Sequence, residues 1–394
     1  MLRRILAALV LACGVMLMPA AAPAKEPATF ELSLEKAVEM AIANSKELQN
    51  AQYDIDRAWE VREKAADNVK YIPAGIISGD DAAKAAAAFT GLVQADLSWQ
   101  AKKKAYEVTK DSVVMAVYKA YYNVLSAQEN VRAKEATLKS AEWQRRIAAD
   151  QLRLGMLSKS DFLTVSASIE QATKDLEAAK KALDDAYHQL NQLIGLWPED
   201  RPVLTSRPKY EPLAVDSLDA AVERAVAESP TVWLAKSQVD YYKLRLDLYP
   251  FNSSTVSDPY DAWEIDVSKA EVSAASTEEQ IRKQVRSIYY TAKQLEDSYA
   301  AVLQRLEVNR EKLRVARLKF ELGMATKADV LSAEAELAKT EKDLLDLIAQ
   351  HEICVMLFEK PWVYSGGAGA GTSSGAGASS GAGSSSGSSS QASR

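Results

Sequence analysis

Few residues of this 394-residue chain could do chemistry on a metal ion or a phosphate group. The chain has two histidines, His188 and His351, and two cysteines, Cys13 and Cys354. His351 and Cys354 are three residues apart on one face of an expected helix, but two ligands do not make a closed metal site. Both occupy positions in an apolar seam. We therefore expect them to pack in the core, and we predict no cofactor.

The glycine distribution argues against a nucleotide-dependent enzyme. Nine of the 16 glycines lie after residue 364, so no glycine cluster before it could approach a phosphate closely. The net charge of -6 provides no basic surface for nucleic acid. A chain so poor in glycine should be mainly helical, and we predict that it is not an enzyme and binds no nucleic acid.

The two ends differ in composition from the rest of the chain. Two arginines precede an apolar run at 5–18, and Ala22-Pro23-Ala24 follows, which predicts a signal peptide at 1–24 and export of the protein. Acylation of Cys13 is an alternative. In the tail at 365–394, 27 of 30 residues are Gly, Ser or Ala, which predicts a disordered tail, either a spacer or a solvated end.

Long helices should fill most of the chain between these ends. Residues 92–154 and 260–322 contain neither glycine nor proline, which favours helices of about 50 residues. Apolar residues recur in alternating steps of three and four along 165–193 and 281–320, and in the second seam only Asn309 is polar. This spacing is typical of helices packed as in a coiled coil.

The chain repeats itself. Residues 33–45 match 217–229 at eight of 13 positions, and residues 154–176 match 322–344 at ten of 23 positions, with an offset of 168. Tyr121-Tyr122 falls on Tyr289-Tyr290 at the same offset, and we expect these tyrosines to be packing residues and not a binding site. The repeats predict two helical units at 25–197 and 217–364, joined by a Pro-rich linker at 198–216.

Each unit should contain a short break before its long helix. Residues 93–100 alternate apolar and polar side chains, which predicts a strand, and residues 262–267 are a weaker equivalent. A strand that crosses a membrane takes about 9 to 11 residues. A spanning hairpin with its turn needs about 22 residues. The break at 71–100 could barely hold one and includes a helical run at 82–88, and the break at 250–270 is shorter and contains two prolines. We therefore expect a short or degenerate β region whose membrane contact stays open.

Two similar turns should connect the long helices into antiparallel hairpins. They begin at Leu154-Gly155-Met156 and Leu322-Gly323-Met324, where glycine can end a helix in the left-handed conformation. Ser158 and Thr326 can then cap the following helices, with Asp161 and Asp329 three residues further on.

These turns, each followed by an aspartate and a leucine, make residues 33–360 resemble the TolC family of outer-membrane efflux proteins. The resemblance implies a homotrimer whose long helices form a hollow α-helical barrel. It also implies passive export driven by an inner-membrane pump through a periplasmic adaptor, and a place in the outer membrane or at the envelope face. The turn residues that would dock the adaptor are Leu154, Gly155, Met156, Ser158, Leu322, Gly323, Met324 and Thr326.

The resemblance also implies a charged pore entrance. Asp329, helped by Asp161, would contribute to an acidic ring that favours cations, although Ser332 replaces a second aspartate of the family and weakens the ring. Helix capping alone is the competing interpretation of both aspartates.

For the whole chain, the alternative is a structural coiled-coil protein of the envelope without a pore. The charged residues near 134–142 are expected to form a solvated face with i,i+4 pairs.

Overall fold

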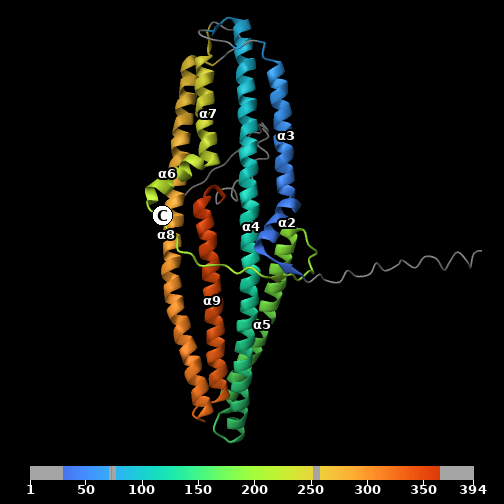
Figure 1. The fold of residues 1–394 in the computed structure, drawn as a ribbon, viewed down its shortest axis with the longest axis vertical. Coiled ribbons are helices and arrows are strands. Elements are labelled where there is room, and N and C mark those ends of the chain that lie inside the picture. The colour runs from blue at the N-terminus through green and yellow to red at the C-terminus, as the bar shows by residue number, and fades with distance from the viewer. Residues whose placement is uncertain (1–29, 71, 73–76, 252–257, 364–394) are drawn as a thin grey trace, which may run out of the picture.

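The computed structural model describes residues 30–70, 72, 77–251 and 258–363. The predicted signal peptide at 1–24 and tail at 365–394 lie outside the described residues. The described part is an elongated, mainly helical body, with eight helices and four two-residue strands (Figure 1). In chain order its elements are β1 (Glu31–Leu32), α2 (Leu34–Asn44), α3 (Lys46–Asp67), β2 (Ile77–Ser78), α4 (Asp80–Arg153), α5 (Lys159–Ile194), β3 (Val203–Leu204), α6 (Leu218–Glu228), α7 (Pro230–Asp247), β4 (Pro250–Phe251), α8 (Tyr260–Glu321) and α9 (Lys327–Glu359).

The two expected long helices are present and extend further than the sequence indicated. Helix α4 has 74 residues and α8 has 62. At 1.5 Å per residue, α4 is about 110 Å long. Each long helix folds back at its end onto a shorter antiparallel helix, α5 or α9, and both turns lie at the same end of the body (Figure 1).

The predicted strands at 93–100 and 262–267 are wrong, because both segments are helical. A run this short fits the helical period as well as the strand period. On α4, Asp96 pairs with Arg62 of α3, and Trp99 packs against the ring of Trp59, which also belongs to α3. These contacts with α3 favour the helical conformation of this segment over a strand. Gly91, which falls in the break expected at 71–100, therefore lies within α4.

The β structure of the described residues is limited to two short parallel pairings. Strand β1 pairs with β3 near the middle of the body, and β2 pairs with β4 at the end opposite the turns. The expectation of a short β region is confirmed for the part of the chain that the structure covers. None of the described helices combines the length and apolar character needed to cross a membrane.

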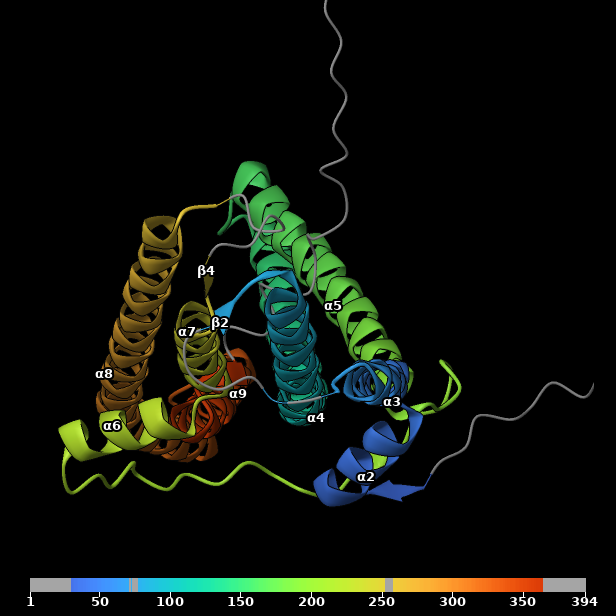
Figure 2. The ribbon, with the colours of Figure 1, turned by 90° about the horizontal axis from the view of Figure 1, so that it is seen from above.

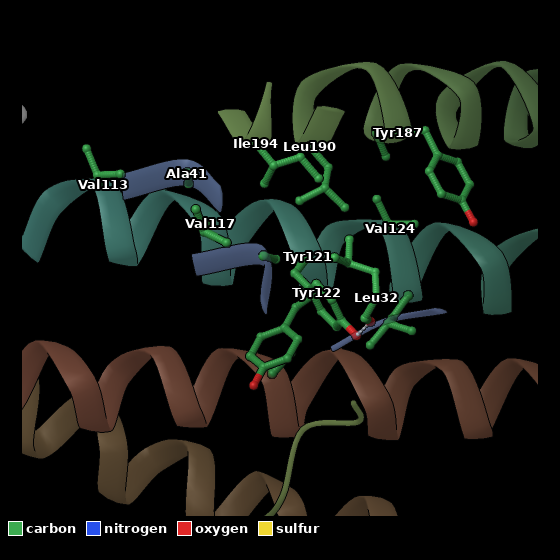
Figure 3. Close-up of a cluster of buried hydrophobic side chains, with 14 of the residues drawn as sticks. Leu32, Ala41, Val113, Val117, Tyr121, Tyr122, Val124, Tyr187, Leu190 and Ile194 are labelled. Atoms are coloured by element: carbon green, nitrogen blue, oxygen red, sulfur yellow. Dashed lines mark hydrogen bonds between the residues drawn. The ribbon is translucent and has the colours of Figure 1, made fainter. Parts of the chain in front are cut away.

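The main core lies where short helices pack across the long ones. Tyr121 of α4 is fully buried among Leu32, Val117 and Leu190 (Figure 3). Its hydroxyl donates to the carbonyl oxygen of Leu32 at 2.9 Å and accepts from the N–H of Ser206 at 3.0 Å. A first-unit tyrosine thus joins α4 to β1 and to the linker.

A second core in the other unit surrounds the α8–α9 seam. Ile281, Val285 and Ala292 are buried there, which confirms this part of the predicted apolar seam. The polar seam residue Asn309 is buried too, and its side-chain amide donates to the hydroxyl of Thr340 at 2.8 Å. The expectation that both tyrosine pairs are packing residues is wrong within the single chain for Tyr290, which is exposed on α8.

Candidate docking and entrance region

Both hairpin turns end their first helix with the same backbone arrangement. Gly155 and Gly323 each have φ of 71°, in the left-handed region that L side chains rarely adopt. The N–H of Met156 donates to the carbonyl of Gln151 at 2.8 Å, and the N–H of Met324 donates to that of Lys319 at 2.7 Å. With the 3.0 Å bonds of the glycine N–H groups, these contacts form a Schellman motif in each turn. The predicted glycine C-caps are confirmed.

The next helix of each hairpin is capped by the predicted residues. The backbone N–H of Asp161 donates to the Ser158 hydroxyl at 3.1 Å, and that of Asp329 donates to the Thr326 hydroxyl at 3.3 Å. In the second turn the backbone N–H of Thr326 also donates to the Asp329 carboxylate at 2.7 Å, which completes a capping box. The helix-capping role of Asp329 is therefore confirmed, whereas the Asp161 carboxylate accepts only from the hydroxyl of the capping Ser158.

The capping box holds Asp329 in its charged form. The backbone N–H of Thr326, and next its hydroxyl, donate to the carboxylate and lower the pKa of Asp329 below its usual value. The side chain stays exposed, so the charge remains open to solvent at the end of the body. Asp161 receives its hydrogen bond from the Ser158 hydroxyl at 2.8 Å. Each carboxylate is thus held within its own turn.

The turns also present apolar side chains to solvent. Leu154, Met156, Leu322 and Met324 are between 66 and 74% exposed. In a Schellman motif the residue after the glycine often packs against the preceding turn of the helix, but here the residues in that turn include Gln151 and Lys319. Four large apolar side chains therefore lie uncovered at one end of the molecule.

Open space surrounds the two turn glycines. A Cβ atom placed on Gly155 or Gly323 would meet no atom within 4 Å. Near the second turn, a groove of about 730 Å³ runs along α8 and includes Val308, Met324 and Asp329 among its lining residues. The turn region therefore offers a partner both apolar contacts and room to approach the backbone.

The remaining candidate side chains are part of the packed interior. His351 and Cys354 are buried in the α8–α9 region, as predicted. Among the described residues, no three His, Cys, Asp or Glu side chains are grouped so that they could hold a metal ion. Burial raises the pKa of the Cys354 thiol and keeps it protonated.

Ion pairs between helices are a feature that no pattern in the sequence indicates. Lys134, expected on a solvated face with i,i+4 pairs, binds Asp175 of α5 at 2.8 Å. Arg132 of α4 lies 3.7 Å from Glu341 of α9, beside a charged cavity of about 380 Å³ between the hairpins. Such pairs join residues far apart in sequence, so only the packing of the hairpins shows them.

Comparison with known proteins identifies relatives for this arrangement. The profile of the family described as Outer membrane efflux protein matches residues 91–196 and 242–353, which is more than half of the chain. Outer membrane protein TolC of Vibrio cholerae is 21% identical over 283 residues, which cover 61% of this chain and 65% of the relative. The chain thus matches less than two thirds of that relative's length.

Solved structures have a similar fold. A membrane protein from Pseudomonas aeruginosa superposes with a TM-score of 0.62 and 14% identity, covering 86% of this chain and 90% of that one. The outer membrane protein VceC from Vibrio cholerae gives a TM-score of 0.60 and 13% identity, covering 84% and 95%. At these identities the likeness concerns the fold alone.

Proposed function

The chain belongs to the outer membrane efflux protein family, and from this we propose that it forms a passive export conduit. Family membership confirms the resemblance, the mainly helical fold and the localisation at the outer membrane or envelope face. The family consists of efflux channels, and we infer that this chain likewise performs no catalysis. In the proposed conduit, three copies form a homotrimer, and a pump of the inner membrane supplies the energy through a periplasmic adaptor.

The observation that carries the proposal is the pair of equivalent turns at one end of the body (Figure 1). A conduit that docks an adaptor needs a contact surface at one end. Because the chain contains two repeated units, each unit should contribute an equivalent part of this surface. Residues 25–197 and 217–364 act as these units in the proposal, with 198–216 as the linker between them. Each unit contributes an exposed Leu-Gly-Met turn. The docking residues are those of both turns, including the capping Ser158 and Thr326.

The same end supplies the proposed pore entrance. Asp329 stays ionised because its capping bonds favour the carboxylate, and Asp161 lies at the matching position of the first turn. Copies arranged around an axis would bring several carboxylates near a narrow opening. Their negative potential would attract cations most strongly at low ionic strength, because salt screens exposed charges.

Conductance in planar bilayers tests this function. The purified chain should give discrete current steps with a preference for cations at low salt. Asp329→Asn removes the charge but keeps a side chain that can cap a helix, so it should reduce the preference while circular dichroism stays unchanged. Unchanged selectivity would leave Asp329 with only its capping role. If the wild-type chain gave no channels, the structural coiled-coil alternative would be favoured.

Substitution in the turns tests adaptor docking. Met156→Asp with Met324→Asp places charge on the exposed apolar surface without touching the core, so the protein should fold and lose export in cells. Val203→Asp is a matched control, because Val203 is also exposed but lies near the middle of the body. Full export by the double variant would remove the docking role from the turns.

A further inference from the structure

Two tryptophans from neighbouring helices line a cavity in the half of the body away from the hairpin turns. Helices α3 and α4 lie side by side there (Figures 1 and 2). The ring centroids of Trp59 on α3 and Trp99 on α4 are 4.9 Å apart. The cavity has a volume of about 510 Å³, which suits a small organic molecule. All of its lining residues come from these two helices, namely Ile55, Asp56, Trp59, Glu60 and Trp99.

Two carboxylates of α3 border the same cavity. Asp56 and Glu60 are four residues apart, so their side chains share one face of the helix. Both are exposed, and neither forms an ion pair with any of the described residues. Asp56 accepts one hydrogen bond, from the side-chain amide of Gln52 at 3.0 Å. Two negative charges therefore lie beside aromatic rings without a protein cation paired to them.

The two rings already attract cations of the protein. The Arg62 guanidinium lies 5.0 Å from the ring centroid of Trp59, and the Lys103 ammonium lies 4.5 Å from that of Trp99. Both distances are within the range of cation–π attraction. Arg62 is held in place by its ion pair with Asp96. Lys103 is exposed and forms no ion pair in the described part of the chain, so another cation could displace it from the ring.

The second repeat unit has a protein cation at the equivalent place. Helices α2 and α6 begin 184 residues apart, and so do α3 and α7. This offset places Lys243 at the position of Trp59 and Asp240 at that of Asp56. The Lys243 ammonium binds Glu271 of α8 at 2.8 Å, and Glu271, with a smaller effect of Asp240, raises the pKa of Lys243. In the first unit a tryptophan replaces this lysine, and the aspartate lies beside a cavity instead of a cation.

We propose that this cavity binds an organic cation, a protonated or quaternary amine attached to a flat apolar group. The positive charge lies beside Asp56 and Glu60, and the apolar group packs against the two tryptophan rings. The rings alone would accept any apolar molecule, and the exposed carboxylates alone would attract any small cation. Only a ligand with both features uses both parts of the cavity. All lining residues belong to one chain, so the inference does not depend on the proposed conduit.

Equilibrium dialysis of the purified chain against N-methylquinolinium tests the site. This probe is a flat aromatic cation, and methylnaphthalene is a neutral molecule of nearly the same shape. The cation should bind more tightly than the neutral probe, and added salt should weaken the binding of the cation alone. Equal affinity for the two probes would contradict the site.

Substitutions in the cavity should change the affinity for N-methylquinolinium in both directions. Trp59→Ala removes one ring and should lower the affinity by about tenfold. Lys103→Met should raise it, because no lysine then competes for the Trp99 ring. Trp143→Ala is the matched control and should leave the affinity unchanged. Trp143 is 37% exposed, against 36% for Trp59, and has Arg146 at 4.9 Å from its ring, but it lies outside the cavity.

Two further variants keep the inference testable if Trp59→Ala fails to fold. Asp56→Asn with Glu60→Gln changes exposed side chains only and should remove the preference for the cationic probe. Trp59→Lys reproduces the second unit and should abolish binding, because its ammonium would take the place of the probe's charge. Circular dichroism should show that both remain helical. Unchanged binding by both variants, or no binding by the wild-type chain, would overturn the cation site and leave the proposed conduit standing.

Discussion

At the scale of single residues, the Asp329 carboxylate should make the fold sensitive to acid. Its capping bonds lower the pKa in the folded state below the unfolded value. A lowered folded pKa means that its stabilisation is complete above the unfolded pKa, near 3.9, and is lost as the pH falls through the folded value. Thermal unfolding between neutral pH and about pH 2 should therefore show a smaller acid loss in Asp329→Asn. Identical pH profiles would contradict a charged cap.

The capping residues are also the part of the candidate site that the sequence predicted most completely. Ser158, Thr326 and both aspartates occupy the positions that their spacing indicated, because capping depends on residues within one turn of each other. The prediction for Tyr290 is wrong for the opposite reason. This residue has a local sequence like that of Tyr122 but different neighbours in space. Only the packing of the helices determines which of the two side chains is buried.

At the scale of elements, the α8–α9 hairpin depends on one buried polar pair. Asn309 donates to the hydroxyl of Thr340, which donates in turn to the carbonyl of Glu336 at 2.9 Å. Asn309→Ala leaves a cavity and removes a buried hydrogen bond, so urea unfolding should show a loss of about 1 to 3 kcal/mol. Asn309→Leu with Thr340→Val should recover part of it. If Asn309→Ala were neutral, the pair would not stabilise the seam.

Replacing a turn glycine should destabilise the fold because of the backbone conformation at that position, and not because a side chain would lack room. A Cβ at Gly323 would meet no neighbour, but φ is 71°. Gly323→Ala should therefore cost about 1 to 2 kcal/mol in unfolding free energy through the left-handed conformation alone. Gly91→Ala is the control, because Gly91 is helical with open space around it, and alanine should stabilise it slightly. Equal effects at both sites would contradict this explanation.

The long helices were predictable because glycine and proline end them, and the seams were predictable from the spacing of apolar residues. The helical state of 93–100 was not, since Asp96 and Trp99 take their structure from contacts with Arg62 and Trp59, which are distant in sequence. Local alternation therefore indicated the wrong element where a neighbouring helix decides the outcome.

At the scale of the whole molecule, a single chain would form only part of the wall of the proposed conduit. Its helices make one curved layer whose turns lie at one end and whose edges leave Tyr290 and Leu163 uncovered (Figures 1 and 2). In the proposed conduit, three copies together enclose the channel, the turns contact the adaptor and the aspartates surround the opening. The structural coiled-coil alternative needs no closed ring.

Electron microscopy of the purified chain in detergent, averaged in views along its long axis, shows directly whether the copies form a conduit. A conduit requires a closed ring of three copies around an open lumen, with the Leu-Gly-Met turns of all copies at one end. A solid bundle, an open arc or a single chain in these views would contradict the conduit.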